Sequence, residues 1–90
     1  MKRIIITVLG NDQVGIIARV CTVLAEHHVN ILDISQTILH GLFHMAMVAD
    51  YTDCNVGLDE LLEELDALGQ SMGLRIQGQN EEIFQMMHRI

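Results

Sequence analysis

The chain alternates between short β-branched runs and longer stretches whose apolar residues recur every three or four positions. From Arg3 to Leu9 the apolar residues form an unbroken run, which is typical of a strand central in a sheet. The stretch from Val14 to His28 has helical spacing instead. Its stripe consists of Ile17, Val20, Cys21, Leu24 and His28, widened by Ile16 and Val23. The pattern predicts a strand followed by an amphipathic helix.

Two more strands are predicted from Asn30 to Leu39 and from Leu42 to Tyr51. A two-residue primed turn with Gly41 at its first central position fits the connection, and a neighbouring register also fits. One face of the pair then carries Ile34, Ile38, Met45 and Met47. The opposite face carries a polar strip of Asp33, Ser35, Thr37 and His44.

A second helix is predicted from a leucine stripe whose intervening positions are acidic. The stripe consists of Leu58, Leu61, Leu62, Leu65, Leu68 and Met72. Asn55 is the predicted N-cap and Gly73 the C-terminal stop. A fourth strand follows from Leu74 to Gln79. Asn80 is then placed to cap a short last helix, with Glu81 and Glu82 in its first turn and His88 and Arg89 in its last.

This order of elements predicts an α+β fold, the ferredoxin-like βαββαβ sandwich. Right-handed crossovers place both main helices on one face of a four-stranded antiparallel sheet. Ninety residues make a single domain, with residues 1–80 as its core and 81–90 as a helical tail. The second face of the sheet is left open, which favours self-association.

Composition and charge exclude some classes of partner and indicate a compartment. The formal net charge is -7, and the basic residues are scattered, which excludes a direct nucleic-acid binder. No apolar run approaches the roughly 20 residues that span a bilayer, so no membrane partner is predicted. Cys21 and Cys54 lack CxxC spacing, and a thiol in a polar turn is compatible with a reducing compartment. We therefore expect a cytoplasmic protein.

The strongest candidate for chemistry is the polar turn from Gly10 to Gly15, which leads into the first helix. A helix start has backbone N–H groups without intrahelical acceptors and carries partial positive charge, so it can hold a carboxylate or a phosphate. Asn11 and Asp12 also form turns and caps routinely. The residues alone therefore leave a ligand role and a purely structural role both open.

The sequence gives little support for a catalytic site or a metal site. Ser35 and Cys54 have no acid–base partner in a recognisable motif. Neighbouring helical residues point about 100° apart, so His27 and His28 are poorly placed to chelate one ion, and no zinc motif is present. We predict no catalytic residue, no metal ligand and no cofactor, and we interpret the histidines as solvated.

Two segments carry a resemblance to a known family. The residues from Ile6 to Ile17, followed by those from Val29 to Gln36, resemble an ACT domain. The chain is similar, more narrowly, to stand-alone bacterial ACT proteins related to the glycine-cleavage-system transcriptional repressor. The terminal residues from Ile83 to Ile90 also look like the tail of that group.

The resemblance implies a regulatory homodimer that binds an amino acid or a related small metabolite and acts through a separate partner protein. The implied ligand contacts are Asn11, Asp12, Gln13, Val14, Gly15 and Ile16, faced by Asn30 and Ile31 from the same or a neighbouring copy. Many ligand-responsive members carry an Arg–Pro pair where Gln13 and Val14 stand here. This departure motivates the alternative, a protein-interaction module with no small ligand.

Overall fold

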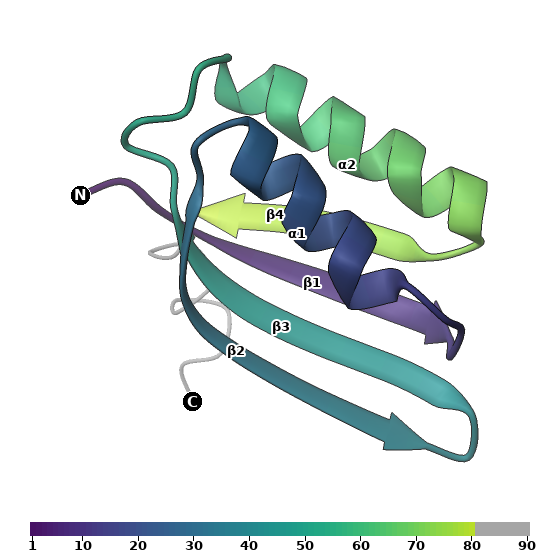
Figure 1. Ribbon diagram of the computed structural model, residues 1–90. Helices are drawn as coiled ribbons and strands as arrows, with labels where there is room; N and C mark the ends of the chain where they lie inside the picture. The colour runs from purple at the N-terminus through teal and green to yellow at the C-terminus, as the bar shows by residue number, and fades with distance from the viewer. Residues whose placement is uncertain (81–90) are drawn as a thin grey trace.

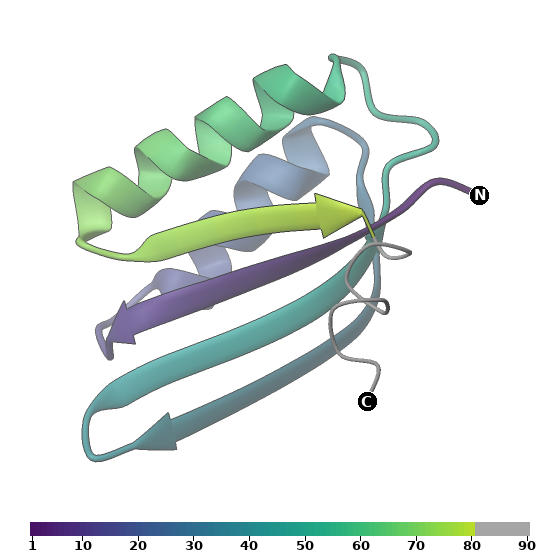
Figure 2. The same cartoon turned by 180° about the vertical axis from the view of Figure 1, so that it is seen from behind.

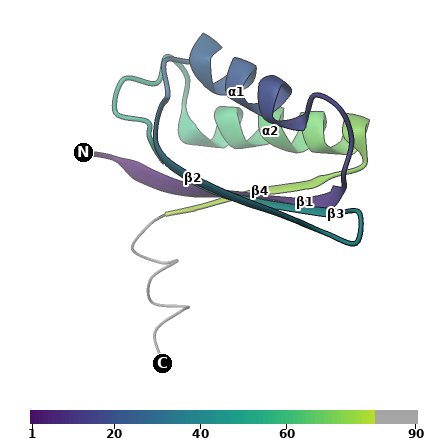
Figure 3. The ribbon, with the colours of Figure 1, turned by 60° about the horizontal axis from the view of Figure 1, so that its bottom comes forward.

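The computed structural model describes residues 1–80 and has two layers, a sheet and a pair of helices (Figures 1 and 3). The elements are β1 (Arg3–Asn11), α1 (Ile16–Glu26), β2 (Asn30–Leu39), β3 (Leu42–Asp50), α2 (Leu58–Met72) and β4 (Arg75–Asn80). The strand order is β2-β3-β1-β4, and each neighbouring pair is antiparallel. The predicted ferredoxin-like fold is confirmed. The predicted C-terminal helix lies outside the described residues.

The core lies between the sheet and the helices, and strand alternation decides which residues enter it. On β1 the side chains of Ile4, Ile6 and Val8 are completely buried. The odd-numbered residues of β3 face the same side, from Phe43 to Ala49. Each large apolar side chain that is fully buried contributes about 1.5–3 kcal/mol, so this shared face fixes the register of β1 against β3.

Helix α1 is shorter than predicted at both ends. It begins at Ile16 because Gly15 has a left-handed backbone (φ 90°), and it ends at Glu26 before His28, whose φ is also positive. Val20 and Leu24 of the predicted stripe are buried. Ile17 is 37% exposed, and its neighbour Ile16 is buried in its place. The buried stripe consists of Ile16, Val20 and Leu24.

The hairpin between β2 and β3 adopts the neighbouring register. Leu39 pairs with Leu42, so His40 and Gly41 are the two central turn residues. Both have positive φ, as a type I′ turn requires. The predicted division of faces is confirmed. Ile34 pairs with Met47 on the helix side of the sheet, and strand alternation places the polar residues on the opposite side, namely Asp33, Ser35, Thr37 and His44.

The ends of the other elements differ by small amounts from the predictions. Strand β1 continues two residues further, to Asn11, because it pairs with β3 as far as Leu42. Gly73 ends α2 in the left-handed conformation, as predicted. Asn55 as the N-cap of α2 is wrong, since Gly57 occupies that position without a side-chain cap. Within residues 1–80, no helix is long and apolar enough to cross a membrane.

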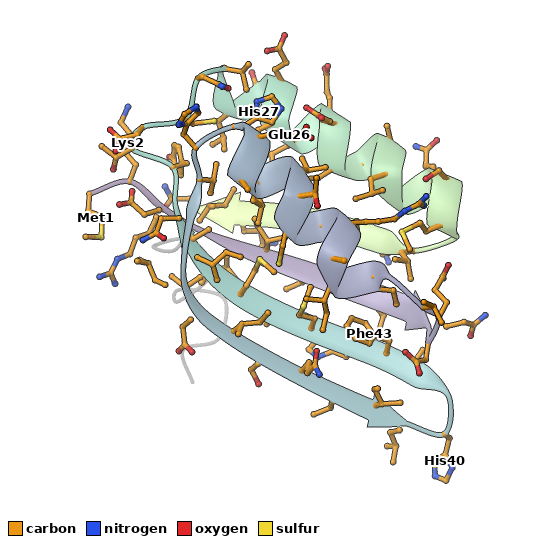
Figure 4. All side chains as sticks on the ribbon, viewed as in Figure 1. Met1, Lys2, Glu26, His27, His40 and Phe43 are labelled. Carbon is orange, nitrogen blue, oxygen red and sulfur yellow. The ribbon has the colours of Figure 1, made fainter. Side chains whose placement is uncertain are left out.

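Asn55 has a different partner, the ring of His27 at the end of α1. Its Nδ2 donates to the Glu26 carbonyl at 3.2 Å, which turns its Oδ1 towards His27 Nδ1 at 2.7 Å. The other ring nitrogen, Nε2, lies 2.5 Å from a carboxylate oxygen of Glu64 on α2. His27 and Glu26 lie at the α2 side of the molecule in Figure 4. Our interpretation of His27 as solvated is therefore wrong.

Both groups that contact the His27 ring are hydrogen-bond acceptors, so the ring binds them best with both nitrogens protonated. The hydrogen bond that His27 donates to Asn55, followed by the one it donates to Glu64, raises the pKa of His27 above its usual value of 6.5. A histidine whose pKa is raised by folding stabilises the folded state below its unfolded-state pKa. That stabilisation is lost as pH rises through the folded-state pKa. His27 thus ties α1 to α2 most strongly in the protonated form.

We predict that His27→Gln costs more unfolding free energy at about pH 6 than at a pH above the folded-state pKa of His27, where the parent ring is neutral. Urea titrations of parent and variant at both pH values measure this difference. In the Glu64→Gln background the effect of His27→Gln loses part of its pH dependence, and the part that depends on Asn55 remains. An equal cost of His27→Gln at both pH values would contradict the assignment.

Candidate functional site

The turn after β1 is fixed by contacts to two other elements. The backbone N–H of Asp12 donates to the Gly41 carbonyl at 2.8 Å, in the hairpin turn. The side chain of Gln13 donates from Nε2 to the Met72 carbonyl at 2.9 Å, at the end of α2. Gln13 therefore supplies a donor to an otherwise unpartnered helix-end carbonyl. The residue that departs from the family pattern has a structural contact of its own here.

The same turn comes close to the connection between α2 and β4. A Cβ atom added at Gly10 would lie 2.5 Å from a methyl group of Leu74 and 3.3 Å from the Gly73 carbonyl. The absence of a side chain at position 10 thus allows the end of β1 to approach this connection closely. The turn after β1 is therefore held by contacts to three other segments, and a preorganised binding site needs such support.

Helix α1 begins without a side-chain cap. Gly15 is the N-cap residue, and its carbonyl accepts the first intrahelical hydrogen bond, from Arg19 at 3.0 Å. The N–H groups of Ile16, Ile17 and Ala18 precede that bond and have no acceptor within the helix. No acidic residue lies in the first turn to neutralise the helix dipole. The start of α1 therefore carries partial positive charge and has backbone N–H groups that can donate hydrogen bonds.

This helix start borders a hollow of about 300 Å³ on the helix side of the sheet. The far wall comes from the hairpin, through Gln36 and Ile38 on β2 and Phe43 on β3. Figure 4 shows Phe43 near the beginning of α1. The remaining lining residues are Asp12, Gln13, Gly15, Ile16, Ile17 and Ala18. Polar groups on the turn and apolar groups on the strands thus converge on one space.

The structure brings four of the eight predicted ligand residues to this hollow, namely Asp12, Gln13, Gly15 and Ile16. Asn11 pairs with Leu42 at the end of β1, and the Val14 side chain is fully exposed outside the lining.

Asn30 and Ile31 lie at the opposite end of β2, beside Asp50 and Ala49. Roughly 25 Å of strand separates them from Ile38. Within one copy of the chain they do not meet the turn.

Sequence reasoning missed several residues that line the hollow, namely Ile17, Ala18, Gln36, Ile38 and Phe43. The alternation of the hairpin strands contains the signal for three of them. Gln36 and Ile38 share the helix-facing side with Ile34, and Phe43 pairs with Ile38. The sequence alone does not show that this end of β2 lies opposite the start of α1.

The described part of the chain contains no cluster of metal-binding side chains. Among residues 1–80, no group of three or more His, Cys, Asp or Glu side chains could hold a metal ion. The site at the start of α1 combines backbone N–H groups with one carboxylate and two amides. Such a set suits an organic anion or zwitterion better than a metal.

A four-stranded antiparallel sheet with two helices on one face, and a hollow at the start of the first helix, defines a class of small α+β domains. Comparison with known proteins identifies the family within it. The chain belongs to the ACT domain family, whose model matches residues 2–79. The ACT domain family is regulatory.

Individual relatives agree with this assignment. A UPF0237 protein of Bifidobacterium longum is 53% identical over 90 residues, covering 100% of both chains. The solved structure of an ACT domain protein from Streptococcus pneumoniae is 39% identical, with a TM-score of 0.79, covering 93% of this chain and 94% of that one.

A structure of a putative glycine cleavage system transcriptional repressor superposes with a TM-score of 0.71 at 22% identity. It covers 87% of this chain and 44% of that one, and at this identity the likeness shows the fold alone. The predicted resemblance to the ACT domain family is confirmed.

The left-handed backbone at Gly15 gives a direct test of the local geometry. We predict that Gly15→Ala lowers the unfolding free energy by about 1–2 kcal/mol more than Gly57→Ala does. Both glycines are helix N-caps with open space around an added Cβ, but Gly57 has φ −65° and Gly15 has φ 90°. Chemical denaturation of the two variants measures the difference. Equal losses would contradict the backbone assignment at Gly15.

Proposed function

We propose that this protein is a regulatory module that binds an amino acid or a related small metabolite at the start of α1. It acts as a homodimer and passes the signal to a separate partner protein. The observation that carries the proposal is the uncapped helix start, whose N–H groups border a hollow of about 300 Å³. A carboxylate placed there satisfies donors that the chain itself leaves without a partner.

The remaining lining groups match the other parts of an amino acid. The carboxylate of Asp12 is the acceptor for an ammonium group, through a charge-assisted hydrogen bond. The amide of Gln36 adds a neutral donor and acceptor on the opposite wall. Ile38 and Phe43 supply apolar surface for the ligand side chain. A few placed polar groups in an otherwise apolar hollow are typical of small-molecule sites.

The dimer is supported by the exposed edge of the sheet at β2. Nine of the ten β2 residues are exposed, and these include four large apolar side chains, Leu32 (40%), Ile34 (43%), Ile38 (55%) and Leu39 (68%). No other described strand pairs with this edge. An unprotected strand edge with apolar side chains is a template for pairing with another chain. A second copy of β2 is the complementary partner.

Two-fold symmetry connects this dimer to the ligand site. If two β2 strands pair antiparallel about a centre at Ser35, the bulge between Ile31 and Asp33 places Asn30 of the second copy opposite Leu39. Ile31 of the second copy then lies opposite Ile38, which lines the hollow. This arrangement brings Ile31 to the helix side of the site, with Asn30 next to it on the other face, so ligand binding and dimer formation stabilise one another.

We predict that at least one common amino acid binds the parent protein, measured by calorimetric titration. Ala18→Asp weakens that binding about tenfold or more, because it places a carboxylate at the helix start where the ligand carboxylate must lie. The same change favours the helix itself, since an acidic residue in the first turn stabilises α1. Ala18→Asn is the matched neutral control and retains more of the affinity.

Two results would contradict this proposal. The first is no heat of binding for any common amino acid with folded protein. The second is equal affinity for Ala18→Asp and Ala18→Asn, which would place the ligand away from the helix start.

We predict that Ile34→Lys converts the dimer to monomer, because two-fold symmetry brings both introduced charges close together near the axis. Sedimentation velocity at equal protein concentrations measures the change. Ala67→Lys is the control, because Ala67 is exposed on α2, which packs against α1 and β4 rather than β2. A parent protein that sediments as a monomer, or equal behaviour of both variants, would contradict pairing through β2.

The alternative function is a protein-interaction module with no small ligand. The specific observation that favours it is Gln13, whose side chain is occupied by the Met72 carbonyl. In that case the β2 edge receives a strand of the partner protein by β-augmentation. The calorimetric and sedimentation experiments separate the two functions, because only the first requires an amino acid to bind.

A further inference from the structure

The face of the sheet opposite the two helices contains a second hollow, of about 180 Å³. Figure 2 shows this side of the sheet, on which no helix of residues 1–80 lies. Its floor is apolar and its rim is polar. The residues around it are Ile5, Asp33, Ile34, Ser35, Ala46, Met47 and Val48. The hollow spans β1, β3 and β2, far from the helix start that forms the ligand site.

Strand pairing explains why a hollow forms there. Ser35 on β2 pairs with Ala46 on β3, so two small side chains lie next to one another. The larger Val48 and Ile5 pair beside them and form one wall. Ile5 is 7% exposed although it does not belong to the core cluster between sheet and helices. The shape is suited to one large apolar side chain from outside the sheet.

Residues 81–90 supply such side chains. Five of these ten residues are large and apolar, namely Ile83, Phe84, Met86, Met87 and Ile90. Burial of these apolar side chains lowers the free energy of the folded chain by about 25 cal/mol per Å² of apolar surface removed from water.

The segment starts close to the hollow. Asn80, the last residue of β4, pairs with Ile4, which is next to Ile5 on β1. The centre of the hollow lies at β3, two strand spacings or roughly 10 Å from β4. Ten residues span about 15 Å as a helix and about 33 Å when extended. Either conformation reaches the hollow from Asn80.

The charge at the end of the segment matches the far side of the face. Its acidic residues, Glu81 and Glu82, directly follow Asn80. Arg3 on β1 is paired with Asp50 on β3, so that end of the face carries both signs of charge. The basic residues of the segment, His88 and Arg89, come last, and Asp33 lies on the edge strand β2. A segment that runs from β4 across β1 and β3 towards β2 therefore brings its basic end near an opposite charge.

We propose that residues 81–90 of the same chain dock on this face, with an apolar side chain, Phe84 or Met87, in the hollow. The docked segment converts the open side of the sheet into a second, smaller core. It leaves the β2 edge and the start of α1 accessible. The inference does not depend on the proposed ligand, which binds on the other face, and it shares with the proposed dimer only the strand β2, whose Ile34 borders the hollow.

Disulfide trapping tests the location in the full-length chain, with Cys21→Ala and Cys54→Ser as the background. Ala46→Cys is paired with Phe84→Cys in one protein and with Met87→Cys in another. We expect rapid oxidation within one chain in at least one of them, detected by intact mass and non-reducing electrophoresis. The control pairs Phe84→Cys with Glu63→Cys, which is exposed on α2 on the other side of the sheet.

No faster oxidation than in the Glu63→Cys control would overturn the proposal. Disulfide-linked dimers in place of internal links would also overturn it, because they would assign the face to the segment of a second copy.

A pair of variants with the natural cysteines provides a second measurement. Phe84→Ser lowers the melting temperature by about 5 °C or more and increases the fluorescence of an anilinonaphthalene dye, because the apolar face becomes exposed. Gln85→Ser, one position further along the chain, leaves both unchanged. Equal melting temperatures and dye fluorescence for the two variants would count against docking as firmly as a missing cross-link.

Discussion

The packing of two helices on one face of the sheet is the constraint on which the rest of this structure depends. Alternate residues of β1 and β3 are completely buried beneath α1 and α2, and they fix the strand register. Because a slip of one residue would expose every one of these side chains, the register has no close competitor. The same alternation sends Ile5, Ala46 and Val48 to the opposite face and creates the apolar floor there.

The candidate ligand site depends on this packing although few of its atoms belong to the core. The turn that precedes α1 contacts the hairpin through Asp12 and the end of α2 through Gln13. Gly15, which follows them, has a left-handed conformation, and the first residues of α1 border a hollow. The chain thus keeps donors unpartnered at a rigid position, which favours the binding of an anionic group.

Three surfaces of this small domain have separate proposed binding roles. The helix start is the proposed site for an amino acid, the β2 edge for a second copy, and the far face for residues 81–90. They lie on different sides of the sheet, yet β2 contributes to all of them through Ile38, Ile34 and Ser35. An edge strand can serve two faces and an edge at once because its side chains alternate and its outer backbone groups are unpaired.

The sequence by itself determined the order of elements, the division of faces on the hairpin and the polar turn at the start of α1, because local periodicity and glycine positions encode these features. It did not determine that α1 begins at Ile16, that Asn55 contacts His27, or that Gln36, Ile38 and Phe43 line the hollow. Those facts depend on which distant segments meet. Only the tertiary structure decides such contacts, since they arise from packing between elements and not from the pattern within any one of them.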